Sequence, residues 1–341
     1  MNRVSEPRKL KVMTVVGTRP EIIRLSRVIG KLDRFVEHTL VHTGQNYDYE
    51  LNEIFFKDLE VRKPDRFLNA AGANGAETIG KVIIAVDEAL AAVEPDALLV
   101  LGDTNSCMAA LPAKRRKVPV FHMEAGNRCY DDRVPEEVNR RIIDHSSSFL
   151  LPYTERSKDN LVREGIERER IFVTGNPIFE VIESFRPEID ASKVLEQLGL
   201  ESRGFYLVTM HRAENVDDPR RLASLAEALS LLAEEHGVPV IVSVHPRTAS
   251  RLASQNVVAR SGRVRFLEPF GFFDFIHLEK NAPLVLSGSG TVQEECAIFG
   301  VPHATIRDVT ERPETIECGS NILAGVDPES IRSAAELVLA T

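Results

Sequence analysis

Short apolar segments alternate with longer amphipathic segments along almost the whole chain. The apolar segments are rich in Val, Leu and Ile and are apolar throughout, as in strands of a parallel sheet with both faces covered. Between them, apolar residues recur with the period of a helix, as at 20–33, 76–93, 154–164 and 218–236. We expect strands at 10–16, 38–43, 97–101, 118–122, 148–152, 171–174, 205–210, 239–244, 264–267, 283–287, 301–306 and 321–324.

This alternation of strand and helix occurs in two blocks, with an interruption near 176–200 where Pro177 and Pro187 break the rhythm. Repeated strand–helix units are typical of parallel sheets with helices on both faces. We therefore expect an α/β fold with two doubly wound domains, residues 1–178 and 179–341. Ligands of such sheets bind beyond the carboxyl ends of the strands, which here predicts a site in a cleft between the domains.

Composition and charge narrow the function. The 341 residues include 42 Lys and Arg against 51 Asp and Glu, so the net charge of −9 argues against a nucleic-acid partner. A hydrophobic content of 43% provides a core and excludes a disordered chain. The four cysteines lack CxxC spacing, so we expect no zinc site and no disulfide framework. The apolar runs are too short to span a membrane and the first residues are polar, which predicts a soluble cytoplasmic protein.

The first expected strand runs into the turn GTRPE (17–21), ahead of a helix. A glycine turn at a helix N-terminus offers backbone N–H groups and the positive end of the helix dipole to an anion. Arg19 and Arg24 would add cationic partners for a diphosphate. The alternative is an ordinary turn with solvated arginines and Pro20 at the first helical position, since no complete GxGxxG or P-loop pattern is present.

Three acidic residues follow expected strands or open a helix. Asp103, in GDTNS (102–106), is either a carboxylate facing the cleft or the cap of the next helix. Glu124 lies between an apolar strand and a glycine turn, which suits a proton-transfer group, although it could instead be the partner of an arginine. Glu136 directly follows Pro135 and on local grounds is typical of the acidic first turn of a helix.

In the second block, the residues that follow the expected strands are of types suited to binding a nucleotide. His211 and Arg212 follow a strand, where they could contact phosphate, although a lone histidine is more often structural. The small residues of 287–291 would let a phosphate approach a helix N-terminus, and Glu295 one turn later could bind ribose hydroxyls. Arg312 lies in a second turn that combines a cation with a proline.

Together these segments resemble the non-hydrolysing UDP-N-acetylglucosamine 2-epimerase family. Any one motif is weak evidence, but eight occur in order over almost the whole chain. The residues within these motifs are more similar to those of a subgroup, the UDP-N-acetyl-L-fucosamine synthases, which epimerise UDP-2-acetamido-2,6-dideoxy-L-talose at C2. The matching segments are GTRPE (17–21), GDTNS (102–106), HMEAGNR (122–128), RVPEEVNRR (133–141), GNP (175–177), HRAEN (211–215), SGSGTVQEE (287–295) and ERPE (311–314).

The resemblance implies two Rossmann-like domains in the glycosyltransferase-B arrangement, a UDP-sugar substrate, a homodimer, and neither a metal nor another cofactor. It implies a catalytic set of Asp103, Glu124 and Glu136, with His211 on the phosphate side. The residues that it implies for binding the UDP-sugar are Arg19, Arg24, Phe275, Ser289, Gly290, Thr291, Glu295 and Arg312.

The chain departs from the family pattern in three places. Arg24 replaces a lysine common in the parent enzymes, which keeps the charge but changes the donor geometry. Gln45-Asn46-Tyr47 stands where the parent enzymes have a Gln-His-Arg stretch for a regulatory UDP-N-acetylglucosamine, so we do not expect that regulation. Relatives continue into a C-terminal helix that crosses back to the first domain, and we expect this helix to be missing or shortened after Thr341.

The resemblance also implies a mechanism. The C2 proton of a 2-acetamido sugar has no adjacent carbonyl, so the family eliminates UDP across C1–C2 and adds it back with C2 protonated on the other face. We expect UDP-2-acetamido-2,6-dideoxy-L-talose as the substrate, with UDP-N-acetylglucosamine as the alternative within the family. Three functions outside this activity stay open, namely a hydrolysing epimerase, a retaining glycosyltransferase on the same fold and a non-catalytic nucleotide-sugar sensor.

Overall fold

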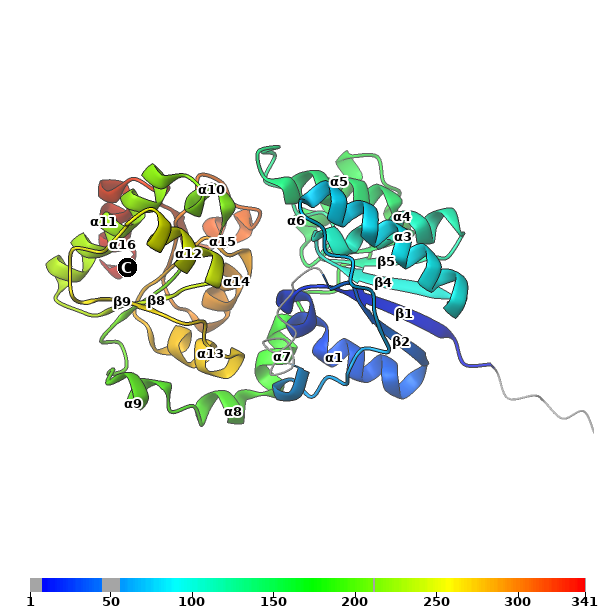
Figure 1. Ribbon diagram of the computed structural model, residues 1–341, viewed down its shortest axis with the longest axis horizontal. Coiled ribbons are helices and arrows are strands. Elements are labelled where there is room, and N and C mark those ends of the chain that lie inside the picture. The colour runs from blue at the N-terminus through cyan, green and yellow to red at the C-terminus, as the bar shows by residue number, and fades with distance from the viewer. Residues whose placement is uncertain (1–7, 45–55, 211, 341) are drawn as a thin grey trace, which may run out of the picture. The chain divides into compact units, whose positions relative to one another are not determined.

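The computed structural model describes residues 8–44, 56–210 and 212–340. The chain divides into two compact units, Met1–Val181 and Ile182–Thr341 (Figure 1). The division falls within helix α7 (Ile178–Ser184), and the boundary expected at 178/179 falls at the start of the same helix. Among the described residues, no helix is both long enough and apolar enough to cross a bilayer.

The N-terminal unit contains a six-stranded sheet in which every pair of neighbouring strands is parallel. The strand order β3-β2-β1-β4-β5-β6 is that of a Rossmann fold, whose order reverses between β1 and β4. The strands are β1 (Lys11–Val16), β2 (Glu37–His42), β3 (Arg66–Phe67), β4 (Ala97–Leu101), β5 (Val120–Met123) and β6 (Phe149–Leu151).

Helices connect these strands and bury their apolar faces against the sheet. Met13 and Val15 of β1, for example, lie in one core cluster with Val82 and Val86 of α3. In the described part of this unit, the helical segments before α7 that have both ends placed are α1 (Arg19–Phe35), α3 (Gly75–Val93), η1 (Asn105–Ala109), α4 (Ala110–Arg115), α5 (Pro135–Ser146), α6 (Glu155–Arg163) and η2 (Arg168–Arg170).

The C-terminal unit repeats the plan with a second six-stranded parallel sheet of order β12-β11-β10-β7-β8-β9. Read from its other edge, this is again the Rossmann order, with the reversal between β7 and β10. The strands are β7 (Tyr206–Thr209), β8 (Val240–Ser243), β9 (Val264–Leu267), β10 (Val285–Ser287), β11 (His303–Thr305) and β12 (Asn321–Leu323). The helices are α8 (Arg186–Asp190), α9 (Val194–Leu198), α10 (Ala213–Val216), α11 (Pro219–His236), α12 (Pro246–Ser254), α13 (Phe272–Asn281), α14 (Gly290–Phe299), α15 (Pro313–Glu317) and α16 (Pro328–Ala340).

The continuously apolar strands are explained by two cores, one on each face of this sheet. Tyr206 and Val208 of β7 belong to a cluster that includes residues of α11 and α16. Leu207, which points to the opposite face, belongs to a second cluster with residues of α13 and α14. The expected fold class, two doubly wound Rossmann-like sheets, is confirmed.

The sequence pattern was wrong at two strands. The expected strand 171–174 is reduced to an isolated parallel bridge between Ile171 and Leu150, although Phe172 N–H still donates to the Leu150 carbonyl oxygen and Thr174 N–H to that of Pro152. Phe172 and Val173 are accordingly 51% and 37% exposed, so their apolar character does not report a buried strand. The short strand β3 was not expected, since its two residues, Arg66 and Phe67, form no apolar run.

Candidate active site

A glutamate from the first turn of α1 occupies the backbone N–H groups of the glycine turn after β1. The backbone N–H groups of Gly17 and Thr18 donate to Glu21 Oε2 at 2.6 and 2.7 Å, and Thr104 Oγ1 donates to Glu21 Oε1 at 2.6 Å. Burial raises the pKa of Glu21, although these hydrogen bonds act in the opposite direction. The expectation that these two N–H groups receive an anion is therefore wrong, because the Glu21 carboxyl of a capping box already occupies them.

Arg24, one turn further along α1, pairs with Glu124, which follows β5. The two side chains are 4% and 7% exposed. Tyr153 Oη donates to Glu124 Oε2 at 3.4 Å, and the Arg24 guanidinium lies 5.9 Å from the centre of the Tyr153 ring. Glu124 has a φ of 65°, a left-handed conformation that is costly for a residue other than glycine and is often found at functional sites. The sequence left open that Glu124 is the partner of an arginine, and the structure shows that partner to be Arg24.

Asp103 follows β4 and is held by helix α5. Arg140 Nε donates to Asp103 Oδ2 at 2.8 Å, and Asn139 Nδ2 donates to the Asp103 carbonyl oxygen at 2.9 Å. The alternative of Asp103 as a helix cap is wrong, because Thr104 occupies the cap position and accepts from the Ser106 N–H. Asp103 is 23% exposed and therefore remains accessible to solvent.

The two neighbouring acids in the first turn of α5 have different surroundings. Glu137 is fully buried and accepts from the backbone N–H groups of Cys129 and Tyr130, both at 3.0 Å. Glu136 is half-buried and precedes Asn139 and Arg140 by three and four residues. Because such spacings share one face of a helix, Glu136 lies on the face of α5 that contacts Asp103.

The acidic groups therefore converge at one edge of the N-terminal sheet. Asp103 follows β4, Glu124 follows the neighbouring strand β5, and α5 carries Glu136. A Cβ atom built on Gly102 would lie 3.7 Å from Glu124 Oε2, so the turn after β4 is next to the Glu124 carboxylate. Such a set of carboxyl groups is suited to giving and taking protons at a carbon between them.

In the C-terminal unit, the turn of small residues joins β10 to α14. Thr209 Oγ1 and Ser287 Oγ lie 2.6 Å apart across the neighbouring strands β7 and β10, and Ser289 N donates to Ser287 Oγ at 2.9 Å. A Cβ atom on Gly290, the first residue of α14, would lie only 2.7 Å from Glu311 Oε1. Because the turn follows β10 and the strand order reverses between β7 and β10, it lies at the position where open sheets of this type bind their ligands.

Arginine–carboxylate pairs surround this turn. Arg212 donates to the Gly288 carbonyl oxygen at 3.2 Å and pairs with Glu311, also at 3.2 Å. Arg307 pairs with Glu311 at 3.0 Å, and Arg312 pairs with Glu294. His211, whose side chain was expected here, lies outside the described residues.

The remaining expected nucleotide contacts lie on α13 and α14. Thr291 is in the first turn of α14, Glu295 is 4% exposed on the same helix, and Phe275 of α13 packs partly buried against a core cluster. Burial raises the pKa of Glu279 on α13 well above its ordinary value, and the charge of Glu295 raises it further. The roles of these residues toward a nucleotide, like that of the half-buried Arg19, stay predictions.

Two residues described above were not expected from the sequence. Arg140 holds Asp103, and the only signal was its position four residues after Glu136 on a helix. Glu279, whose pKa is raised by burial and then by the charge of Glu295, lies in an ordinary amphipathic stretch that gave no signal. Within the described ranges, no group of three or more His, Cys, Asp or Glu side chains is arranged to hold a metal ion.

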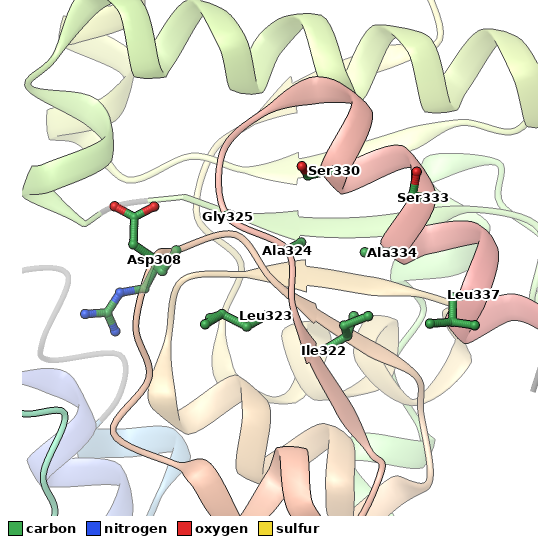
Figure 2. A pocket seen from close by; sticks show the side chains of 10 residues that line it. Asp308, Ile322, Leu323, Ala324, Gly325, Ser330, Ser333, Ala334 and Leu337 are labelled. Atoms are coloured by element: carbon green, nitrogen blue, oxygen red, sulfur yellow. The ribbon is translucent and has the colours of Figure 1, made fainter.

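A pocket of about 520 Å³ lies in the C-terminal unit, and Arg307, which pairs with Glu311, is part of its lining. Figure 2 shows Ser330, Ser333 and Leu337 of α16 and Ile322 and Leu323 of β12 around it. None of the expected site residues lines this pocket. The remaining lining residues are Arg307, Asp308, Ala324, Gly325 and Ala334.

Comparisons with known proteins identify the family. A family model described as UDP-N-acetylglucosamine 2-epimerase matches residues 31–341. The chain is 40% identical over 339 residues to the UDP-N-acetylglucosamine 2-epimerase of Methanocaldococcus jannaschii, covering 97% of this chain and 92% of that protein. It is 37% identical to the UDP-2,3-diacetamido-2,3-dideoxy-D-glucuronate 2-epimerase of Pseudomonas aeruginosa, with the same two coverages. The crystal structure of the M. jannaschii enzyme in complex with UDP-GlcNAc and UDP matches with a TM-score of 0.92 at 40% identity, covering 97% of this chain and 93% of that one.

The chain belongs to the UDP-N-acetylglucosamine 2-epimerase family, and it is an isomerase.

Proposed function

We propose that this protein interconverts UDP-N-acetylglucosamine and UDP-N-acetylmannosamine by non-hydrolysing epimerisation at C2. The observation that carries the proposal is the convergence of Asp103, Glu124 and the Glu136 face of α5 at one sheet edge, in a chain of this family. A non-catalytic sensor would not need these acids, and a retaining glycosyltransferase differs from an epimerase in needing an acceptor.

The proposed reaction balances without an oxidant or reductant. A carboxylate removes the C2 proton, the electrons of that C–H bond form the C1=C2 double bond, and the C1–O bond breaks with its electron pair leaving on UDP. The product of this half-reaction is a 2-acetamidoglycal. In the return step, an oxygen of the UDP diphosphate bonds to C1 again, and an acid delivers a proton to the opposite face of C2. The net change is inversion at C2.

The two demands of this reaction fall on different residues. Proton removal and delivery require carboxyl groups, and we assign them to Asp103, Glu124 and Glu136. Stabilising the departing UDP requires cations and helix N-terminal N–H groups, and we assign this to Arg19 and to the turn 289–291 at the start of α14. We assign His211 to the same task of stabilising the departing UDP. Contacts of UDP with Arg24, Phe275, Glu295 and Arg312 belong to the same proposal and follow from the family resemblance.

The choice of sugar differs from the expectation based on motif spelling. That expectation favoured UDP-2-acetamido-2,6-dideoxy-L-talose, partly on residues 45–55, which lie outside the described residues. The relative with 40% identity is named for UDP-N-acetylglucosamine, which supports the alternative. A relative with 37% identity is named for a diacetamido-glucuronate, so family membership alone does not fix the sugar.

Side-by-side kinetics with three substrates test the choice. UDP-N-acetylglucosamine, UDP-2-acetamido-2,6-dideoxy-L-talose and UDP-2,3-diacetamido-2,3-dideoxy-D-glucuronate would be compared by kcat/KM. We expect the first to be preferred at least tenfold, because a site with a partner for the 6-hydroxyl loses about 1–3 kcal/mol when that hydroxyl is missing. A higher kcat/KM for the 6-deoxy-L-sugar would restore the expectation from motif spelling.

We also propose a homodimer, as the family resemblance implies. Analytical ultracentrifugation at micromolar concentration is the test, with a mass of about twice the 38.0 kDa of the chain expected. A single species at the mass of one chain would contradict it.

A further inference from the structure

A buried histidine lies directly beneath the two acidic turns of the N-terminal unit. His122 is in β5 and is 1% exposed. Its Nε2–H donates to the carbonyl oxygen of Gly102 at 2.8 Å, and Gly102 is the residue before Asp103. Since His122 itself is two residues before Glu124, the ring joins the turn after β4 to the strand that carries Glu124.

The other ring nitrogen of His122 contacts a buried carboxylate on α5. His122 Nδ1–H donates to Asp144 Oδ1 at 2.8 Å, and Asp144 is fully buried. Asp144 Oδ2 accepts from the backbone N–H of Gly126 at 3.2 Å, so the same carboxylate also holds the turn that follows Glu124. One imidazole and one carboxylate thus connect β4, β5 and α5, the three elements that carry Asp103, Glu124 and Glu136.

The donor count fixes the hydrogen atoms on this pair. A carbonyl oxygen only accepts hydrogen bonds, so the bond to Gly102 requires hydrogen on Nε2. Burial acts to raise the pKa of Asp144, but the hydrogen bond from His122 and the charge of Arg128 outweigh it and hold that pKa below its ordinary value. Asp144 accepts at Oδ1, so the geometry of the two bonds places one hydrogen at each ring nitrogen of His122.

The charges around the pair are balanced locally. Arg128 pairs with Asp144 at 2.8 Å and with Glu164 at 2.6 Å, and His145 lies 3.8 Å from Glu164. The side chains of Arg128 and Asp144 are both inaccessible to solvent, so water does not screen their interaction. Arg128 thus contacts Oδ2 of Asp144, while His122 contacts Oδ1.

We propose that His122 and Asp144 form a clamp that sets the spacing of Asp103 and Glu124, and that both are positioning residues for proton delivery at C2. The proposal rests on the epimerisation proposed above. Neither residue needs to touch the substrate. Because a displacement of about 1 Å can cost about a hundredfold in rate, loss of one arm of the clamp is expected to show in the chemistry before it shows in the fold.

Two substitutions separate the two arms. Asn places its amide near the position of a histidine Nδ1, so His122→Asn retains a donor to Asp144 and loses the bond to Gly102. Gln places its amide near Nε2, so His122→Gln retains a donor to Gly102 and loses the bond to Asp144.

His38 offers a matched control in the same sheet. Its side chain is 1% exposed, its Nδ1 lies 2.6 Å from Asp33 Oδ1, and its Nε2 lies 2.8 Å from Thr14 Oγ1. It pairs with Val12 near the amino end of β2, away from the carboxyl ends of the strands. His38→Asn and His38→Gln therefore remove a similar buried histidine without disturbing either acidic turn.

The measurement is the amount of 2-acetamidoglycal and UDP released for each molecule of epimer formed. This ratio is independent of how much of the protein is folded, so a merely structural loss does not change it. When the two acids are out of position, protonation of the bound glycal slows and release competes better. We expect both His122 variants to raise the ratio about tenfold or more, with the UDP affinity within about twofold of the wild type, and the His38 variants to leave the ratio unchanged.

An unchanged ratio in both His122 variants, or an equal rise in the His38 variants, would overturn the clamp. NMR of the ¹⁵N-histidine-labelled wild type separates this failure from failure of the proposed function. We expect two protected ring N–H signals from His122, assigned by their loss in His122→Asn. If the wild type forms neither epimer nor glycal, the proposed function fails while these signals still test the clamp, and a ring with only one N–H would contradict it.

Discussion

Arg24 and Glu124 form a buried ion pair between side chains that lie 100 positions apart in the sequence. Arg24 comes from the first helix of the N-terminal unit, and Glu124 comes from the end of β5 in a left-handed conformation. The pair shows that a carboxylate assigned to proton transfer is held in one orientation before substrate arrives. It also connects α1 to the acidic edge of the sheet.

Removing the arginine from this pair should destabilise the fold. In Arg24→Met the Glu124 carboxylate stays buried and loses its ion pair, while the longer hydrogen bonds from Tyr153 and Asn127 remain, so we expect the free energy of unfolding to fall by about 3 kcal/mol. Urea unfolding of Arg24→Met, Glu124→Gln and the double variant gives the measurement. The double variant should recover at least about 1 kcal/mol relative to the sum of the two single losses, whereas additive losses would show that the two groups do not interact.

Neighbouring acids on α5 should respond differently to the same substitution. Glu136→Gln should lower kcat by about 10²–10⁴-fold and leave the free energy of unfolding nearly unchanged. Glu137→Gln should mainly lower stability, because Glu137 is buried and accepts two backbone hydrogen bonds. Steady-state kinetics, calorimetry with UDP and urea unfolding would separate the two. Asp103→Asn and Glu124→Gln should behave like Glu136→Gln in kcat, and loss of UDP affinity in all three would indicate structural roles instead.

The sequence predicted the fold well because a doubly wound sheet depends on local patterns. Continuous apolar runs, helical periods and glycine turns at strand ends identify strands and crossovers without knowledge of the partners. The short strand β3 was not predicted, since Arg66 and Phe67 make no apolar run. The expected strand 171–174 failed for the opposite reason, because Phe172 and Val173 are apolar but exposed.

Gly17 should not tolerate a side chain. A Cβ atom there would lie 1.9 Å from Ser106 Oγ and 2.3 Å from Thr43 Oγ1, so we expect Gly17→Ala to lose about 2 kcal/mol of stability. Gly30 lies exposed in the interior of α1 with no atom within 4 Å of an added Cβ. There Gly→Ala should instead gain about 0.5–1 kcal/mol. Urea unfolding measures both, and equal effects at the two glycines would contradict the close packing of the turn after β1.

The stability of the protein should fall as the pH is lowered from 6.5 toward 4, in part through His303. Burial lowers the pKa of His303 from 6.5 to about 4, although its hydrogen bond with Asn321 acts in the opposite direction. Between these values the unfolded chain binds a proton that the folded protein does not, so stability rises with pH across this window. The effect is up to about 1.4 kcal/mol per pH unit.

Urea unfolding at intervals across that window, for the wild type and for His303→Asn, tests this account. Asn retains a polar partner for Asn321 but does not titrate, so the variant should show a slope of free energy against pH that is smaller by up to about 1.4 kcal/mol per unit. Parallel slopes would show that His303 is not protonated on unfolding.

The candidate site was harder to predict than the fold because its contacts are distant in sequence. Arg140 was visible only as a helix residue, yet it holds Asp103 across 37 positions. The motif around Glu21 indicated an anion site, whereas the Glu21 carboxyl itself occupies the turn. Local patterns show which residue types follow a strand, but the partner that each side chain finds depends on the packing of the whole unit.

The central claim, elimination and re-addition at C2, is tested most directly by incubating the protein with UDP-N-acetylglucosamine in deuterated water. Elimination removes the C2 proton, and the return step takes a solvent-exchanged proton from a carboxyl group. Mass spectrometry should therefore find UDP-N-acetylmannosamine with one deuterium at C2, with the UDP still attached. Epimer formed without deuterium, or free N-acetylmannosamine and UDP as the main products, would contradict the account.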